Sequence, residues 1–295
     1  MSQAATASTL RGPQERFSLP DQIDPTARLM ARAENLIRQL SSSILLRKTA
    51  RVLRLYKAAN LYLRFFPVVK KLPGGVAYRA RRVESILLSR QMLESGTMYP
   101  RSKLPTQVER FVDLGCNVGF FACWLAESYG ATSLKGLMID ANKEVVEEAA
   151  WHARTNHWQE VFAVHGVAGE RSPSGRADFY VYWSNYCSAT QRNPFLRGPW
   201  KRTSVPCVDV GELWRQKFGS ARCQLLKVDI EGSEMDFFRV EQPFLALVDA
   251  ILLEWHKWRV QLPEVEGLLA ASGFKLGELL EEKELEGTCL FRRVT

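Results

Sequence analysis

Four carboxylates end apolar stretches of this sequence, in a spacing that could support chemistry. They are Asp113, Asp140, Asp229 and Glu254. Short apolar runs are typical of buried β-strands, and the carboxyl ends of parallel strands meet at one edge of a sheet, where such sheets bind their ligands. Burial does not explain acids at four strand ends, because an ionised carboxylate is costly to bury. We therefore expect a polar site at this edge.

The first of these stretches leads into a glycine turn. The segment is Arg110-Phe-Val-Asp-Leu-Gly-Cys-Asn-Val-Gly-Phe120. It predicts a strand over residues 111–114, a turn at Gly115 and a helix that begins near Val118. Gly115 and Gly119 let the backbone approach a ligand closely, although tight turns also need glycine for purely conformational reasons.

The residues around this turn favour a nucleoside ligand that carries a positive charge. A dinucleotide fingerprint has a middle glycine where Asn117 stands, and its third glycine is also absent. Asp113 would repel a pyrophosphate but attract the α-ammonium group of a methionine moiety. Asp140 can accept both ribose hydroxyls, or it can cap a helix that starts near Asn142. We interpret the ligand as S-adenosylmethionine rather than NAD.

After this motif, strand and helix patterns alternate, which favours an α/β fold with helices on both faces of a parallel sheet. The expected elements are a helix over residues 145–156 and strands over residues 161–167, 224–229 and 248–254. Two more strands, over residues 274–280 and 288–294, are separated by a charged stretch. They predict a C-terminal antiparallel hairpin that closes the sheet.

The net charge of +8 is unevenly distributed. Residues 1–104 hold 19 Lys or Arg and 6 Asp or Glu, which gives +13, whereas the remainder carries −5. Pro73-Gly-Gly75 suggests a boundary between a basic, mainly helical extension (residues 1–74) and a second domain (residues 75–295). We expect the first twenty residues to be poorly ordered, because they show little apolar periodicity.

Residues 44–66 predict a basic amphipathic helix. Such a helix can lie on an anionic membrane, bind nucleic acid or pack on a neighbouring domain, and we favour packing. No apolar run approaches the roughly 18 residues that a membrane-spanning helix needs, and the N-terminus lacks a signal-peptide core. The expected location is the cytoplasm. The six cysteines form no C-x-x-C pair, so we expect buried reduced thiols and no zinc site.

Four motifs stand at the ends of the expected strands. They are Val112-Asp-Leu-Gly-Cys-Asn-Val-Gly119, Ile139-Asp140, Leu226-Lys-Val-Asp-Ile-Glu-Gly-Ser-Glu234 and Leu253-Glu-Trp-His256. Together they resemble the FkbM-type S-adenosylmethionine-dependent methyltransferases, over roughly residues 75–293. The resemblance implies a class I methyltransferase (Rossmann-like) fold, with a seven-stranded, mostly parallel sheet and a C-terminal hairpin. It also implies O-methylation, commonly of a natural product or a sugar.

The same resemblance assigns roles to individual residues. Those that it places at the cofactor are Asp113, Gly115, Cys116, Asn117, Gly119, Asp140 and Asp229, with Asp140 at the ribose and Asp229 also facing the methyl-transfer region. Many methyltransferases have a glycine where Asn117 stands, but the FkbM type tolerates asparagine. Glu231 and Glu234 would flank the turn at Gly232.

An alcohol acceptor must lose its proton during methyl transfer, and His256 is the first candidate for the base. Its ordinary pKa near 6.5 suits proton transfer around neutrality, although it can also be a structural histidine in an aromatic cluster. Asp229 or Glu231 can serve instead if desolvation raises its pKa. Asp229, Glu231 and Glu254 can also present oxygens to Mg²⁺, but we expect no metal, because acids at a helix start are equally explained by the helix dipole.

Residues 172–206 are rich in aromatic and basic side chains and can either hold the acceptor or form an additional β-hairpin. Three functions remain open. The favoured one is methylation of a hydroxyl on a small molecule or carbohydrate. The second is an RNA or protein methyltransferase that grips its acceptor through the basic N-terminal region. The third is a non-catalytic protein that binds the cofactor or a membrane surface. The sequence does not identify the oligomeric state.

Overall fold

A seven-stranded sheet organises the part of the chain that the computed structural model describes, namely residues 55–95, 98–130, 133–169, 172–182, 189–191 and 200–294. The chain divides into two units, Met1–Tyr56 and Lys57–Thr295. Apart from residues 55 and 56, the first unit lies outside the described residues. The predictions for the first twenty residues, and for the helix before residue 55, therefore fall there.

The strand order of this sheet is β11-β12-β10-β9-β3-β4-β5. The strands are β3 (Arg110–Leu114), β4 (Lys135–Asp140), β5 (Glu160–His165), β9 (Leu225–Val228), β10 (Ala250–His256), β11 (Phe274–Glu282) and β12 (Glu286–Arg293). Neighbouring strands from β10 to β5 are parallel, whereas β12 is antiparallel to both β10 and β11. The mostly parallel sheet with a C-terminal antiparallel hairpin is therefore confirmed.

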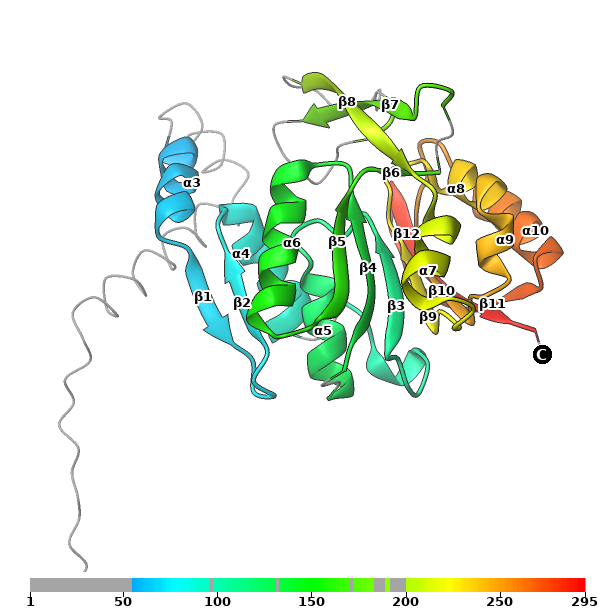
Figure 1. Cartoon of the computed structure of the whole chain (residues 1–295), viewed down its shortest axis with the longest axis horizontal. Helices are drawn as coiled ribbons and strands as arrows, with labels where there is room; N and C mark the ends of the chain where they lie inside the picture. Colours follow the sequence, from blue (N-terminus) through cyan, green and yellow to red (C-terminus); the bar gives the residue numbers. More distant parts are fainter. Residues whose placement is uncertain are drawn as a thin grey trace, which may run out of the picture. The chain divides into compact units, whose positions relative to one another are not determined.

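Helices cover both faces of this sheet (Figure 1). They are α5 (Phe120–Tyr129), α6 (Lys143–Thr155), α7 (Val210–Phe218), α8 (Glu234–Val240), α9 (Gln242–Leu245) and α10 (Leu262–Ala271). Local signals begin several of them: the Asn142 side chain accepts a hydrogen bond from the Glu144 N–H at 3.0 Å, and Asp209 accepts from the Glu212 N–H at 2.8 Å. Such caps satisfy amide groups that a helix start leaves free.

The alternation of side chains along the central strands separates an apolar face from a partly polar one. Val112 and Leu114 of β3 are fully buried in the core that α7, α8 and α10 cover, with Trp214 and Phe237 among their neighbours. Burying each such side chain contributes roughly 1.5–3 kcal/mol. Asp113, between them in sequence, points to the opposite face, which α5 covers.

A short hairpin precedes the sheet in the chain. It consists of β1 (Val68–Lys71) and β2 (Ala77–Ala80), followed by α4 (Val83–Ser89), the π-helical turn η1 (Arg90–Glu94) and the 3₁₀ turn η2 (Arg101–Lys103). Residues 73–75, at which the sequence suggested a boundary, lie in the turn of this hairpin. Arg79 anchors the hairpin on α6 through two hydrogen bonds to Glu148, of 2.7 and 2.9 Å.

A second, smaller sheet follows β5. The segment after β5 forms a second sheet, β6 (Val167–Ala168), β8 (Trp200–Val208) and β7 (Arg176–Tyr182), so the additional hairpin expected in residues 172–206 is present. Residues 183–188 and 192–199 of that segment lie outside the described part of the chain.

The end of the expected amphipathic helix is α3 (Leu55–Phe65). Across the described residues, no helix combines the length and the apolar character that crossing a membrane requires.

Candidate active site

A cavity of about 400 Å³ lies at the carboxyl ends of the central strands. Nine residues singled out from the sequence line it: Asp113, Gly115, Cys116, Asn117, Asp140, Asp229, Glu231, Glu254 and His256. Gly119 does not line it. The sheet thus brings together residues that are more than one hundred positions apart in the chain.

The turn after β3 owes its glycines to close packing within the protein. Gly115 has a φ of +73°, and a Cβ there would lie 1.7 Å from the backbone oxygen of Asp229. The space beside Gly119, where the sequence suggested the approach of a ligand, is filled by Ala149 and Met138, 2.9 and 3.1 Å from the position of a Cβ. Gly119 therefore serves the helix start, and the part of the turn that lines the cavity is formed by residues 115–117.

Asp140 closes this turn from the neighbouring strand. Its carboxylate accepts hydrogen bonds from the backbone N–H groups of Asn117 at 2.9 Å and Asn142 at 2.8 Å. The residue that caps α6 is Asn142, so the alternative role of Asp140 as the helix cap is not the one observed. Burial raises the pKa of Asp140 to about 6, although the two N–H groups oppose that rise.

Asp113 and Lys227 form a buried pair on neighbouring strands. The Lys227 Nζ lies 3.5 Å from Asp113 Oδ1 and 2.9 Å from Asp229 Oδ2. Asp113 is fully buried, and among the described residues neither of its carboxylate oxygens receives a hydrogen bond. Burial raises the pKa of Asp113 to about 6, and the Lys227 charge opposes that rise. No role for Lys227 was predicted from its sequence context.

The charge of the cavity wall favours a cationic ligand. Six carboxylates line it: Asp113, Asp140, Asp229, Glu231, Glu254 and Glu286. Lys227 and His256 are the basic side chains among the described lining residues. Because a cavity wall of low dielectric strengthens electrostatic interactions, this excess of acids attracts positive charge and disfavours a pyrophosphate.

Glu254 and His256 enter the cavity from β10. The sequence predicted a strand that ends at Glu254, but β10 continues to His256, because the hairpin strand β12 pairs with it along its full length. Two residues apart on one strand, both side chains lie on the same face. That face is the one that carries Asp113 and Lys227, since Leu253 and Trp255 belong to the apolar core on the other side.

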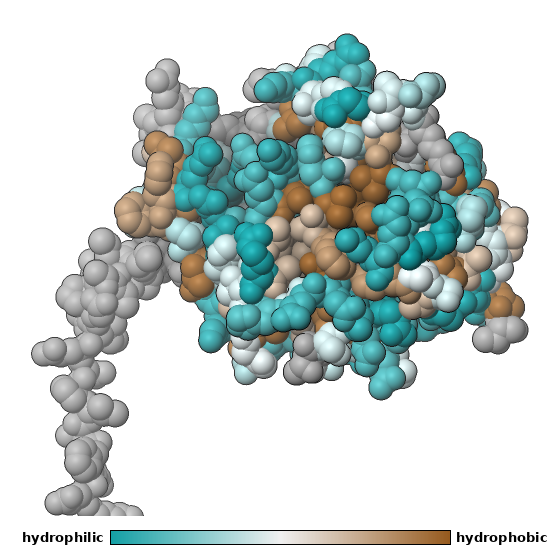
Figure 2. All heavy atoms as spheres, viewed as in Figure 1, coloured by the Kyte–Doolittle hydropathy of each residue, from teal (hydrophilic) through white to brown (hydrophobic). Residues whose placement is uncertain are grey.

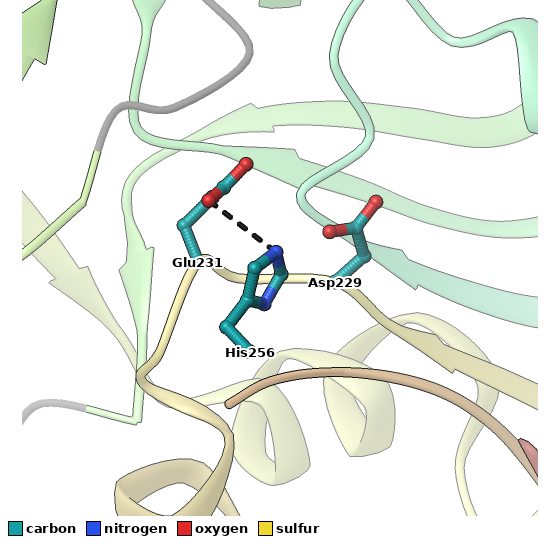
Figure 3. Close-up of side chains that lie close together, drawn as sticks. All are labelled: Asp229, Glu231 and His256. Atoms are coloured by element: carbon teal, nitrogen blue, oxygen red, sulfur yellow. Dashed lines mark ion pairs between the residues drawn. The ribbon is translucent and has the colours of Figure 1, made fainter. Parts of the chain in front are cut away.

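Three side chains converge at this end of the cavity: Asp229, Glu231 and His256 (Figure 3). The His256 Nε2 lies 3.3 Å from Glu231 Oε2. Its Nδ1 lies 2.8 Å from Glu234 Oε1, which also accepts the Gly232 N–H at 3.0 Å. Glu231 has a φ of +53°, a left-handed conformation that is unusual outside glycine, and such strain is often found at functional sites.

The electrostatics of this group change the role expected of His256. Burial alone would lower its pKa, but the hydrogen bond to Glu234 and the charge of Glu231 outweigh burial and raise the pKa of His256 to about 10. An imidazolium has no lone pair to accept a proton, so a raised pKa favours a neighbouring carboxylate over His256 as the base. Burial raises the pKa of Glu231 well above its ordinary value.

Apolar and aromatic side chains also line the cavity. They include Met92 of the π-helical turn, Tyr99, Phe121 and Trp258. In the described structure, Tyr99 Oη and Trp258 Nε1 are buried without a hydrogen-bond partner. Thr190, between β7 and β8, also lines the cavity and is hydrogen-bonded to Ser233 at 2.6 Å.

The comparison with protein families connects this geometry to an activity. Residues 143–276 match the model of the methyltransferase FkbM domain. The match contains Asp229, Glu231 and His256, whereas the turn after β3 and Asp140 precede it. The resemblance inferred from the motifs is therefore confirmed over this narrower range.

The chain also resembles solved structures at low sequence identity, whereas the comparison with curated proteins finds no significant match. TrmK of M. capricolum, solved with S-adenosylhomocysteine, is 6% identical, with a TM-score of 0.40 over 65% of this chain and 66% of that one. An O-methyltransferase of neocarzinostatin biosynthesis, solved with S-adenosylmethionine and 2-hydroxy-5-methyl naphthoic acid, is 11% identical, with a TM-score of 0.42 over 72% and 57%. Magnesium protoporphyrin IX methyltransferase of Synechocystis PCC 6803, solved with S-adenosylmethionine, is 9% identical, with a TM-score of 0.43 over 89% and 97%. The chain thus spans less than two thirds of the length of the first two.

Proposed function

We propose that this chain is an S-adenosylmethionine-dependent O-methyltransferase that acts on a hydroxyl of a small molecule, natural product or sugar. The observation that carries the proposal is a single cavity that joins the turn at residues 115–117 to the group formed by Asp229, Glu231 and His256. One part of this cavity suits a cationic nucleoside, and the other suits removal of a proton.

The cofactor end fits the charges and hydrogen-bonding groups of S-adenosylmethionine. The buried Asp113 carboxylate has no hydrogen-bond donor among the described residues, and an α-ammonium group would supply one. Asp140, held by two backbone N–H groups, is positioned to accept ribose hydroxyls. When bound, this cofactor supplies a methyl group on a sulfonium, which is a good leaving group. The protein then has to align the acceptor oxygen with that methyl group.

The other end of the cavity supplies the proton acceptor. With His256 protonated, the base falls to the neighbouring carboxylates, Glu231 and Asp229. Burial raises the pKa of Glu231, which makes its ionised form a stronger base than an exposed carboxylate. His256 then acts as a positioning residue, because Glu234 fixes its ring and its Nε2 faces Glu231.

The remaining wall suits a small acceptor with an apolar ring face. Tyr99, Phe121 and Trp258 offer aromatic surfaces, and the unpaired Tyr99 Oη and Trp258 Nε1 can recognise polar substituents. The part of residues 172–206 that is described contributes Phe179 and Thr190 to the same cavity. These contacts favour a small molecule or carbohydrate over RNA.

The test is transfer of labelled methyl groups from S-adenosylmethionine to fractionated cell extract. We expect label in a low-mass or carbohydrate fraction, and we expect Glu231→Gln to reduce transfer by roughly 10²–10⁴-fold, the usual contribution of a general base. Glu264→Gln, an exposed acid on α10, is the matched control and should leave transfer unchanged. Label confined to RNA or protein would contradict the acceptor class. Cofactor binding without transfer to any fraction would indicate a non-catalytic protein.

A further inference from the structure

The group at the end of the cavity has the composition of a metal site as well as that of a proton acceptor. Asp229, Glu231 and His256 each offer one ligand atom, and these atoms all lie within 4.8 Å of one another. Figure 3 shows the three side chains converging from the loop after β9 and the end of β10. One imidazole nitrogen and two carboxylate oxygens on one side of a cavity leave the other side open to further ligands.

The distance between His256 and Glu231 fits two ligands of one ion better than a direct charged hydrogen bond. Charge-assisted N–H···O bonds are usually about 2.7–2.9 Å long. Two ligand atoms that each lie about 2.1 Å from one ion are about 3.0 Å apart at a right angle and about 3.4 Å apart at a tetrahedral angle. The observed separation of His256 Nε2 and Glu231 Oε2 is 3.3 Å.

The surroundings hold the ligand side chains as metal sites require. Metal-binding histidines usually donate their second ring nitrogen to a carboxylate or carbonyl, which fixes the ring. Here the fully buried Glu234 is hydrogen-bonded to His256 Nδ1 at 2.8 Å, and Nε2 faces the cavity. Lys227 binds Oδ2 of Asp229, and the carboxylate offers its second oxygen.

An independent feature of the same cavity indicates a polar occupant. Tyr99 is 2% exposed, and its hydroxyl has no hydrogen-bond partner among the described residues. A buried hydroxyl normally finds a partner, so a ligand oxygen or a coordinated water in the cavity would satisfy it. The indole N–H of Trp258, also without a partner in the described structure, lines the same cavity.

We infer that Asp229, Glu231 and His256 bind a divalent cation, which holds the acceptor hydroxyl of the methyl transfer. A mixed set of imidazole and carboxylate ligands with open positions suits Mn²⁺, Fe²⁺ or Zn²⁺ better than Ca²⁺, which needs six to eight oxygens. The binding site stands on the geometry alone, whereas the role of the cation rests on the proposed function. A bound cation would displace the proton from His256 Nε2, because a ligating imidazole nitrogen must be unprotonated. It would also lower the pKa of a coordinated hydroxyl, whose proton would leave to solvent, and would fix the hydroxyl oxygen in the cavity.

The test is Mn²⁺ binding to the full-length protein after treatment with EDTA, measured by titration calorimetry and electron paramagnetic resonance without any acceptor. We expect one site in the wild type. Glu231→Gln and Asp229→Asn should each weaken it at least about tenfold, because each removes a ligand. Glu264→Gln should not. Glu286→Gln should also leave it unchanged, which separates this group from the alternative group of Glu254, His256 and Glu286.

Unfolding curves for each variant, recorded without metal, show whether a loss of binding reflects a loss of fold. A third ligand variant, His256→Asn, removes the imidazole. Glu231→Gln keeps the shape of the side chain, so it decides the test even if His256→Asn fails to fold. The inference is overturned if Mn²⁺ does not bind, or if it binds Glu231→Gln as tightly as the wild type. The labelled-methyl assay, run in EDTA, tests the proposed function separately: transfer at the full rate without metal would remove the cation from the reaction and leave the methyltransferase in place.

Discussion

Replacing Lys227 by methionine tests the buried charge pair on which the cofactor end of the cavity depends. The lysine is 4% exposed and lies between Asp113 and Asp229. Methionine fills a similar volume but carries no charge. The substitution would leave the fully buried Asp113 facing a low-dielectric interior without its cation, and we expect the folded state to lose stability for that reason.

The expected loss follows from the separations in the pair. At 3.5 Å, the attraction of Lys227 to Asp113 is about 5 kcal/mol for an effective dielectric constant of about 20. The loss is smaller than this attraction because Asp113 can take up a proton instead, which at pH 7.5 costs about 1.4 kcal/mol for each pH unit above its pKa of about 6. We therefore expect a net loss of about 2 kcal/mol at pH 7.5, which corresponds to roughly 4–8 °C in Tm for a unit of this size.

The sign of the pH dependence distinguishes this explanation from a simple packing defect. The pKa of Asp113 is already raised to about 6, and removal of Lys227 raises it further. The folded protein then binds more protons than the unfolded chain over this range, so the stability deficit of Lys227→Met should shrink as the pH falls from 7.5 to 6. A packing defect would not respond to pH.

Urea unfolding of four proteins measures the pair: wild type, Lys227→Met, Asp113→Asn and the double variant. We expect the double variant to recover most of the loss, because an amide at position 113 needs no counter-charge. The reasoning is refuted if Lys227→Met unfolds at the same midpoint as the wild type. It is equally refuted if the double variant is as unstable as Lys227→Met at both pH values.

Two further predictions concern the turn after β3. Burial raises the pKa of Asp140 to about 6, so the carboxylate loses its charge as the pH falls through that value, and calorimetry should show weaker cofactor binding at pH 5.5 than at pH 7.5. Asp140→Asn should flatten that profile, and an unchanged slope would contradict the assignment. Gly115→Ala should cost more than about 3 kcal/mol in urea unfolding, because its Cβ would meet the Asp229 backbone at 1.7 Å. Gly130→Ala, at a φ of +60° with nothing within 4 Å, should cost only about 1 kcal/mol, and equal losses would show that backbone strain alone decides.

The order of the strands and helices was predictable because local sequence patterns indicate each of them. The apolar run at residues 111–114, the turn at Gly115 and the following helix appear as β3 and α5 within two residues of their expected bounds. The two C-terminal strands paired as expected, because two apolar runs flank a charged stretch. The bounds of β10 were missed because pairing with β12, rather than its own composition, extends it to His256.

The electrostatic state of the site could not be predicted from local patterns. The prediction of His256 as a base relied on its ordinary pKa, whereas Glu234 and Glu231, which only the fold brings against it, raise its pKa. Lys227 did carry a signal, since a lysine inside an apolar strand two residues before Asp229 must share that residue's face. Tyr99 carried none, because it reaches the cavity from a separate segment.

The glycine motif that first suggested a ligand acts mainly on the protein itself. Gly115 lets the turn after β3 pass against the Asp229 backbone, and Gly119 gives room to α6. This packing brings the loops after β3 and β9 together at the cavity, and each loop carries a non-glycine residue in the left-handed region, Asn117 and Glu231. Such a conformation costs about 1–2 kcal/mol, so it persists only where the surroundings enforce it. The glycines therefore fix the backbone, and the contacts with a ligand fall to the carboxylates that this backbone presents.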